Sequence, residues 1–360
     1  MGRCAGRLPQ RARAVQTRLV RIYRLGDEGR EVGDIQERLT GLDLPIDDAE
    51  LGGRFGSATD AAVRAFQARR SLRVDGLVGP DTWGQLVEAG YRFGDRTLYL
   101  HSPFFRGDDV RALQRKLNAL GFDAGREDGM FGVTTDRAMR DFQRNVGDEP
   151  DGIVGPHTME TLERMRPLES ASSRALVREE EELRRTRPSI ESQVLAIDPD
   201  PADPGGACTY SIAAVLRDQL TTMGAKPSLL RERDERLAPS ARARMANEMG
   251  ATMCVSIALA TGLPEASGPT VSYFGSEHTH SPAGMLLAQL ILEEVEAALE
   301  TRGRLQRLAS SMLRETRMPA VQIEPAFLTN TREASLIDEP QFSDRVGRAV
   351  AAGVKRFFAG

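Results

Sequence analysis

Histidine and cysteine, which often bind metals or act as nucleophiles, are scarce and poorly spaced in this sequence. The 360 residues include four histidines and three cysteines. The cysteines, Cys4, Cys208 and Cys254, are far apart and form no Cys-x-x-Cys motif, so neither a disulfide framework nor a structural zinc site is predicted. His278 and His280 are the only close histidine pair. They follow a Gly-Ser step typical of a surface loop, and no acidic or thiol partner can be assigned to them, so we predict that they bind no metal.

The elements that would position any chemistry begin with an internal repeat. Residues 32–89 recur at 110–165 with matched turns. Each copy opens with apolar residues spaced by three and four, as at Ile35, Leu39 and Leu42, which predicts an amphipathic helix. A Phe-Gly turn and a second helical pattern ending in Phe-Gln follow in both copies. This periodicity predicts a duplicated helical domain.

The third part of each copy carries the motif Asp-Gly-x-x-Gly-Pro-x-Thr, at residues 75–82 and 151–158. Asp-Gly supplies a turn, the apolar pair fills the core, and Gly-Pro ends one element before the next helix begins. The pattern resembles the small three-helix peptidoglycan-binding domain that accompanies many cell-wall hydrolases. The resemblance covers nearly all of residues 31–166.

The ligand-binding residues of these repeats are not identified by the pattern. Trp83 follows the first motif and has two readings, a ring that stacks on a sugar or a partly buried aromatic at a helix start, and the second is favoured. Glutamine recurs at matched positions of both copies, where it serves either a ligand or local hydrogen bonds. These positions are Gln36, Gln67, Gln114 and Gln143.

The texture changes after residue 166. A Ser-rich and charged stretch at 167–192 reads as a solvated linker. Beyond it, strand-like and helix-like segments alternate, which predicts an α/β domain with a mostly parallel sheet. The predicted strands are 194–198, 227–230, 253–257, 271–274 and 320–323, and the predicted helices are 209–223, 239–249, 282–300, 304–315 and 341–358.

This C-terminal pattern resembles the type 3 N-acetylmuramoyl-L-alanine amidases over about residues 190–358. Residues 194–199, Val-Leu-Ala-Ile-Asp-Pro, resemble the first strand of that family. The most specific match is residues 318–330, Met-Pro-Ala-Val-Gln-Ile-Glu-Pro-Ala-Phe-Leu-Thr-Asn, which resemble the strand and loop that carry the catalytic glutamate. The resemblance implies a zinc enzyme that cuts the bond between muramic acid and the stem peptide.

The family's zinc ligands are His, Glu and His, and this sequence departs from all three. Asp200 stands nearest the position of the first histidine ligand, and Gly205 falls near the position of the glutamate ligand. The second histidine ligand belongs to a Ser-Ile-His motif in the family, and Ala258 takes its place here. Because a hydrolytic zinc needs about three protein ligands and an open position, we predict no bound zinc and no cofactor. Glu324 occupies the catalytic glutamate's position. Without a metal-activated water it has little to act on, so we favour the reading in which it caps or hydrogen-bonds the adjacent loop.

Composition and charge leave the compartment to be inferred. A balance of 48 Lys+Arg against 52 Asp+Glu gives no electrostatic reason for a nucleic-acid or anionic-membrane partner. No window is apolar enough to span a membrane, and the arginine-rich start lacks the apolar core of a signal peptide. We therefore predict a cytoplasmic protein. Residues 1–24 keep three readings: a mis-assigned start, a disordered basic arm or an atypical export signal.

Together these patterns predict a multidomain fold with two three-helix domains and one α/β domain. The predicted boundaries are 1–30 for a disordered basic segment, 31–91 and 92–166 for the repeats, 167–192 for the linker and 193–360 for the amidase-like domain. The favoured function is a pseudoenzyme that regulates peptidoglycan biogenesis. The resemblance implies peptidoglycan fragments, lipid-linked precursors and the UDP-N-acetylglucosamine enolpyruvyl transferase as partners. The alternatives are an exported amidase and a protein that only binds the cell wall.

Overall fold

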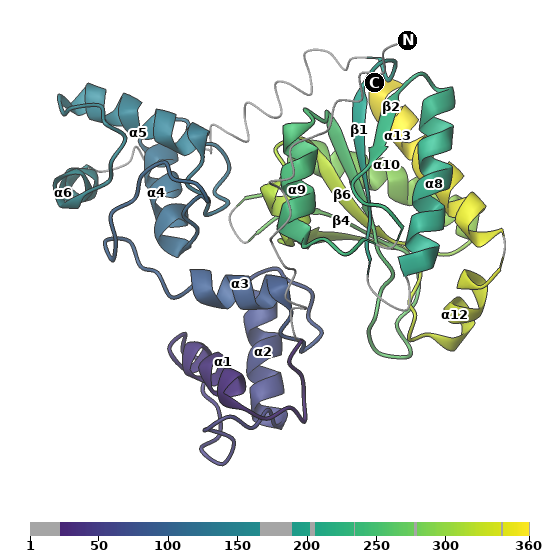
Figure 1. Ribbon diagram of the computed structural model, residues 1–360, viewed down its shortest axis with the longest axis horizontal. Coiled ribbons are helices and arrows are strands. Elements are labelled where there is room, and N and C mark those ends of the chain that lie inside the picture. The colour runs from purple at the N-terminus through teal and green to yellow at the C-terminus, as the bar shows by residue number, and fades with distance from the viewer. Residues whose placement is uncertain are drawn as a thin grey trace, which may run out of the picture.

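The computed structural model describes residues 22–165, 189–201, 206–233, 235–276, 279–339 and 341–359. Within these ranges the chain forms two helical modules and one larger α/β domain, which lie beside one another (Figure 1). The predicted linker at 167–192 falls mostly outside the described residues. The fold is therefore a helical N-terminal region followed by an α/β domain with a mostly parallel sheet, as the sequence predicts.

Each helical module consists of three short helices around its own core. The first contains α1 (Arg30–Thr40), α2 (Ser57–Arg69) and α3 (Pro80–Glu88). The second contains α4 (Asp108–Ala119), α5 (Val133–Val146) and α6 (Pro156–Arg164). The apolar residues that repeat at helical spacing form the two cores, with Ile35, Leu39 and Phe66 in the first and Leu113, Leu117 and Phe142 in the second.

The repeated Asp-Gly motif makes the same turn in both modules. Gly76 and Gly152 have φ angles of 74° and 75°, in the left-handed region that glycine adopts most easily. A Cβ on either residue would lie 2.2 or 2.3 Å from an aspartate oxygen of the preceding helix. Pro80 and Pro156 then occupy the first turn of the third helix, where a missing N–H costs nothing. The motif thus specifies the turn and the helix start.

The first module begins earlier than the sequence indicates. Tyr23 pairs with Val78 through two backbone hydrogen bonds of 3.2 and 2.9 Å, and Glu28 pairs with Arg54. The prediction of a disordered segment over residues 1–30 is therefore wrong for residues 23–30, while residues 1–21 lie outside the described part of the chain. The sequence lacked a visible signal here because backbone pairing, rather than apolar periodicity, orders this stretch.

The α/β domain is built on a six-stranded sheet with the order β2-β1-β3-β6-β4-β5. The strands are β1 (Val194–Pro199), β2 (Lys226–Leu229), β3 (Met253–Ile257), β4 (Thr270–Phe274), β5 (Arg304–Leu308) and β6 (Ala320–Glu324). β2, β1, β3 and β6 are mutually parallel, and β4 runs antiparallel to β6. The carboxyl ends of β1, β3 and β6 therefore meet at one edge of the sheet.

Helices cover both faces of this sheet (Figure 1). On one face α8 (Gly206–Thr222), α10 (Pro282–Leu299) and α13 (Phe342–Ala359) bury an aliphatic core against Ile197, Val255 and Ile323. The alternate residues of the same strands, such as Ala196 and Cys254, face α9 (Pro239–Glu248) and α11 (Ser311–Glu315).

The segment 304–315 differs from its predicted helix. Residues 304–308 form the edge strand β5, which pairs in parallel with β4, and only α11 is helical. Arg304 and Arg307 are exposed on this strand, and charged side chains are common on edge strands because they discourage further pairing. The charged composition of this strand resembles that of a solvated helix, which explains why a helix was predicted. A further short helix, α12 (Thr331–Ile337), was not predicted from the sequence.

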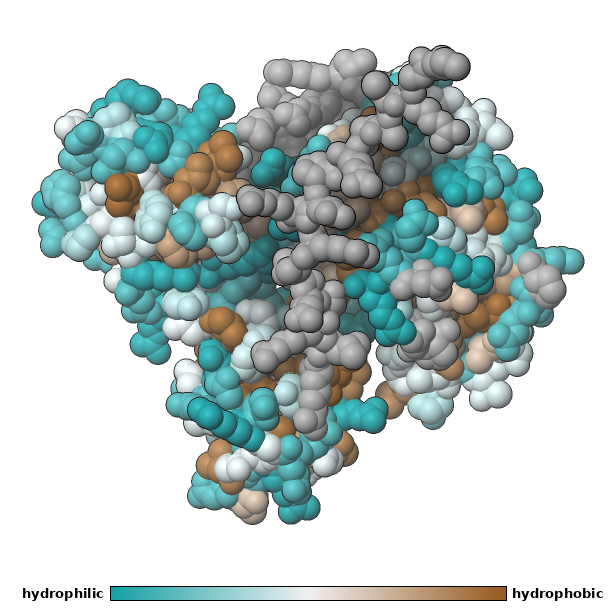
Figure 2. All heavy atoms as spheres, viewed as in Figure 1, coloured by the Kyte–Doolittle hydropathy of each residue, from teal (hydrophilic) through white to brown (hydrophobic). Residues whose placement is uncertain are grey.

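None of the helices in the described ranges combines the length and apolar character needed to cross a bilayer. In the view of Figure 2 the helical modules are mostly hydrophilic, with small separate apolar spots. Exposed apolar residues such as Leu51 and Val133 are scattered, as is ordinary for a protein surface.

Candidate functional site

The positions that the amidase resemblance singles out lie in a row at the carboxyl edge of the sheet. In register, Pro199 lies beside Ile257, and Ile257 lies beside Ile323. The next residue of each strand is Asp200, Ala258 or Glu324. The backbone N–H of Asp200 donates to Ile257 at 2.8 Å, and that of Ala258 donates to Ile323 at 2.9 Å. The structure thus brings these three positions together, while Gly205 lies outside the described residues.

The donor chemistry of this edge does not match a hydrolytic zinc. Ala258 is 4% exposed and offers only a methyl group. Asp200 and Glu324 supply two carboxylates, whereas zinc in a catalytic site takes about three protein ligands. Throughout the described ranges, no group of three or more His, Cys, Asp or Glu side chains could hold a metal ion. The described residues therefore do not fit the family's metal.

Two buried arginines lie directly below the edge. Arg242 Nη1 donates to Asp198 at 2.5 Å, and Ser256 Oγ donates to the other oxygen at 2.8 Å. Burial raises the pKa of Asp198, although the charge of Arg242 opposes that rise. Arg231, which is 4% exposed, donates to the carbonyl oxygens of Pro199 at 2.6 Å and Asp200 at 3.3 Å. Arg231 thus holds the loop after β1, while the charge of Arg242 is balanced by Asp198.

The sequence favoured a Glu324 that caps or hydrogen-bonds the adjacent loop, but the structure pairs this residue with another module. It forms an ion pair with Arg73, which lies between α2 and α3 of the first helical module, and its side chain is 8% exposed. Glu333 holds the neighbouring loop instead, because its two oxygens accept from the N–H groups of Gly268 and Phe327, each at 2.7 Å. The carboxylate of Glu324 is thus paired with a residue of another module and is largely buried. The sequence carried no signal for this partner, since it lies about 250 residues away.

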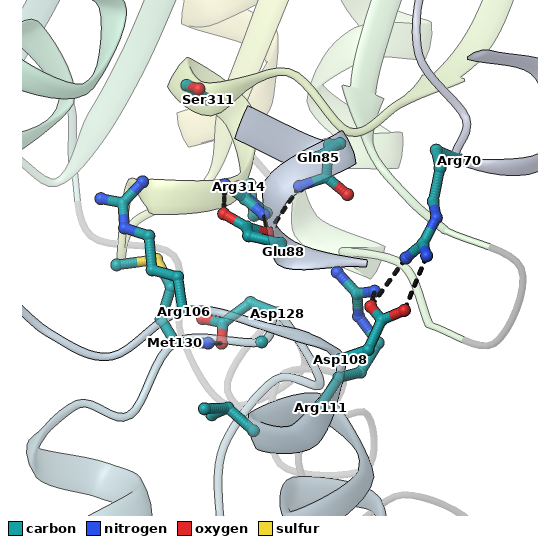
Figure 3. A network of polar contacts seen from close by, with 12 residues as sticks. Arg70, Gln85, Glu88, Arg106, Asp108, Arg111, Asp128, Met130, Ser311 and Arg314 are labelled. Carbon is teal, nitrogen blue, oxygen red and sulfur yellow. Dashed lines mark hydrogen bonds and ion pairs between the residues drawn. The ribbon is translucent and has the colours of Figure 1, made fainter. Parts of the chain in front are cut away.

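Arg73 reaches Glu324 because the first module is docked on α11. Arg314 of α11 donates to both oxygens of Glu88 at 2.6 and 3.0 Å, and the two side chains are 4% and 7% exposed (Figure 3). Burial opposes the charge of Arg314, but the carboxylate of Glu88 outweighs it and raises the pKa of the guanidinium. Asp81 accepts from the N–H of Ser311 at 3.2 Å and also from its hydroxyl.

The second helical module contacts the same helix. Arg106 forms a two-pronged ion pair with Glu315, in which Nη2 donates to Oε2 at 2.7 Å. Arg126 donates to Ser281 Oγ at 3.2 Å, and its guanidinium lies over the ring of Phe274. A two-pronged pair between Arg70 of the first module and Asp108 of the second, at 2.7 and 2.6 Å, joins the repeats. All three modules therefore meet around α11.

The repeated glutamines are structural. All four are at most 2% exposed. Gln143 Nε2 donates to Asp151 at 2.7 Å, and its Oε1 accepts from the N–H of Gly152 at 2.8 Å. Gln67 makes the equivalent bonds to Asp75 and Gly76 in the first module, while Gln36 and Gln114 hold the Phe-Gly loops. Of the two readings left open for these residues, local hydrogen bonding is the one that the geometry supports.

Trp83 is half-buried. It packs against the core of the first module, and the guanidinium of Arg38 lies 5.2 Å from its ring centroid. One face of the ring is therefore occupied by a cation–π contact rather than open to a sugar. This placement accords with a partly buried aromatic on α3.

Cys208, Cys254 and His280, the members of these sets that the structure describes, show no activated group. Burial raises the pKa of both Cys208 and Cys254, which disfavours the reactive thiolate. His280 pairs with Gly275 through the backbone, and its ring meets that of Tyr273 at a centroid distance of 6.5 Å. His278 and Cys4 lie outside the described residues.

Comparisons with known proteins match both parts of the chain. The sequence pattern of the N-acetylmuramoyl-L-alanine amidase family matches residues 207–356. The pattern of the putative peptidoglycan binding domain matches twice, at residues 28–86 and 106–162. The matched segments contain the two helical modules and most of the α/β domain.

One curated relative is similar over nearly the whole chain. The N-acetylmuramoyl-L-alanine amidase CwlM of Mycobacterium tuberculosis is 34% identical, over 93% of this chain and 89% of its own length. The amidase CwlL of Bacillus licheniformis is 32% identical over 39% of this chain and 45% of its own length. Among solved structures, the amidase Ami1 of Mycobacterium smegmatis matches 48% of this chain and 99% of its own, at 20% identity and a TM-score of 0.43.

Proposed function

Because this chain belongs to the N-acetylmuramoyl-L-alanine amidase family and carries two peptidoglycan-binding domains, we propose that it is a catalytically degenerate member that acts as a binding and regulatory factor in peptidoglycan biogenesis. The observation that carries this proposal is the carboxyl edge of the sheet. There Ala258 cannot bind metal, and Glu324 is paired with Arg73. Under this proposal the chain keeps the family's fold and lacks its hydrolytic activity.

The state of Glu324 supports a loss of hydrolysis. A general acid or base must come within hydrogen-bond distance of the proton that it transfers. Here Arg73 contacts one carboxylate oxygen of Glu324, and Glu324 is 6% exposed. Moving substrate to this carboxylate would require the first helical module to withdraw.

The proposed partners follow from the domains and from the family. The two peptidoglycan-binding domains support an interaction with peptidoglycan fragments or lipid-linked precursors. A regulatory role would act on precursor synthesis, and the UDP-N-acetylglucosamine enolpyruvyl transferase is the proposed target. We place the protein in the cytoplasm, a location consistent with the free thiols of Cys208 and Cys254.

The alternative function is hydrolysis of the bond between muramic acid and L-alanine of the stem peptide. It is favoured by the family name of the relatives and by the retained carboxylate of Glu324. It requires a metal site different from the family's, since the described edge supplies two carboxylates and no third donor.

A complementation experiment separates the two functions. Cells depleted of the protein would receive the wild-type chain, Glu324→Gln, or Arg73→Gln as a matched control that breaks the same ion pair without touching the carboxylate. We expect both variants to restore growth and the transferase activity of the extract to similar extents. Loss of complementation by Glu324→Gln alone would favour hydrolysis over regulation.

A further inference from the structure

The junction of the three modules borders an open cavity of about 750 Å³. It lies between the end of α2, the start of α4 and the end of β4, so each module contributes part of its wall. This size is within the range of roughly 300–1,000 Å³ that small-molecule pockets occupy. The wall includes apolar groups such as Phe274 and Ala309, and hydroxyl groups of Ser71 and Ser276.

The charged side chains that line the cavity are mostly arginines. Five arginines and two carboxylates line it, which gives a formal charge of +3. The carboxylates are Asp108 and Glu127. Glu88 pairs with Arg314 and lowers the balance to +2. Glu315 also lies 3.7 Å from Arg314, although it is shared with Arg106. The five are Arg69, Arg70, Arg111, Arg115 and Arg314.

The arginines compete for too few acceptors. Asp108 accepts both prongs of Arg70 and a further bond from Arg111 at 2.7 Å (Figure 3). Arg115 lies 3.6 Å from Glu127 and is half exposed at the mouth, while Arg69 donates only to the carbonyl of Leu42 at 3.3 Å. One carboxylate thus serves two guanidinium groups at the base of the cavity.

Arg111 shows the shortage most clearly. Burial lowers the pKa of its guanidinium, and the neighbouring charges of Arg70 and Arg314 lower it further against the pull of Asp108. The Nε atoms of Arg111 and Arg314 are buried and have no hydrogen-bond partner among the described residues. Both guanidinium groups are thus incompletely satisfied within the described part of the chain.

We infer that this junction is a binding site for a small, soluble, phosphate-bearing molecule. Guanidinium forks match phosphate oxygens in pairs, and several of them around one cavity suit a group with more than one negative charge. The apolar wall accommodates the part of the ligand that carries the phosphate. Because every module contributes to the site, the ligand would favour the docked arrangement of the chain. The inference does not depend on the proposed loss of hydrolysis.

The test is calorimetric titration of the full chain with inorganic pyrophosphate, and separately with ADP, at constant ionic strength. We expect one saturable site per chain for at least one probe. Arg111→Gln should weaken it roughly tenfold or more, as removal of a charge-assisted hydrogen-bonding group does. Tighter binding of ADP than of pyrophosphate would support recognition of an attached organic group, and equal binding would restrict the site to the phosphates.

A second test variant and a matched control complete the experiment. Arg69→Gln with Arg115→Gln changes only exposed side chains at the mouth, so it keeps the test valid if Arg111→Gln fails to fold. Arg144→Gln is the matched control, since Arg144 is an exposed arginine of the second module, paired with Asp141, and does not line the cavity. Absence of saturable binding to both probes, or equal weakening by Arg144→Gln and by the cavity variants, would overturn the inference.

Discussion

Replacement of Glu88 by alanine is expected to release the first helical module from α11. The change removes both hydrogen bonds from Arg314 and the 2.8 Å bond from Gln85. The guanidinium, which is 4% exposed, then keeps only the more distant carboxylate of Glu315, at 3.7 Å, as an ion-pair partner. Removal of one partner from a buried ion pair costs about 3–5 kcal/mol. Each module has its own apolar core, so this cost should fall on docking rather than on the fold of either module.

The docking equilibrium would therefore shift by about 100-fold to several thousand-fold. Hydrogen exchange can measure the shift, because the N–H of Ala309 donates to Ser71 across the interface at 2.8 Å and that of Ser311 donates to Asp81. We expect both amides to exchange faster by a similar factor in Glu88→Ala. Protection of the central strand β3 should be unchanged.

The matched control is Asp344→Ala, which removes the acidic partner of Arg348 from a pair whose side chains are 60% and 51% exposed. Exposed pairs contribute about 0–1 kcal/mol, so exchange at Ala309 should stay near the wild-type rate. If Glu88→Ala also leaves exchange at Ala309 and Ser311 within about threefold of wild type, the buried pair does not hold the modules together.

Three further predictions concern the repeats. Gly152→Ala should destabilise the second module by more than about 1 kcal/mol in urea unfolding, whereas Gly147→Ala should cost less, because both residues have positive φ angles but only Gly152 has an atom within 2.3 Å of the new Cβ. Equal losses would refute the steric argument. Gln143→Leu should cost roughly 1–3 kcal/mol by leaving the buried N–H of Gly152 unpaired, and an unchanged unfolding midpoint would contradict this. The backbone N–H of Ile153 lowers the pKa of Asp151 despite some desolvation, and Gln143 lowers it further. The stability that ionised Asp151 contributes is therefore present above the ordinary pKa of 3.8 and is lost as pH falls through the lower folded value. Thermal melts of Asp151→Asn should accordingly fall less between pH 5 and pH 2.5 than those of wild type, and parallel curves would contradict the assignment.

The repeats and most of the sheet were predictable because their signals are local. The spacing of Ile35, Leu39, Leu113 and Leu117 marks helices, and Asp-Gly marks turns regardless of the surrounding fold. Segment 304–315 was misread since an exposed edge strand and a solvated helix share the same charged composition. Pairing of Tyr23 with Val78 left no pattern to read, because the backbone makes it.

The candidate site was predictable only in part. The resemblance predicted that Asp200 and Ala258 stand at the family's metal-ligand positions and Glu324 at its catalytic position. The register of β1, β3 and β6 explains why the three residues adjoin. The partner of Glu324 was out of reach, because Arg73 meets it only when the first module docks on the α/β domain. The arginine-lined cavity escaped the sequence for the same reason, since its wall combines all three modules.

The central claim, a family member without the family's chemistry, is tested most directly by the metal content of the full chain together with its action on peptidoglycan. After zinc loading and dialysis, mass spectrometry of the metal should find far less than one zinc per chain, and purified sacculi should release no stem peptides. One tightly bound zinc per chain, with release of stem peptides that Glu324→Ala abolishes, would contradict the account.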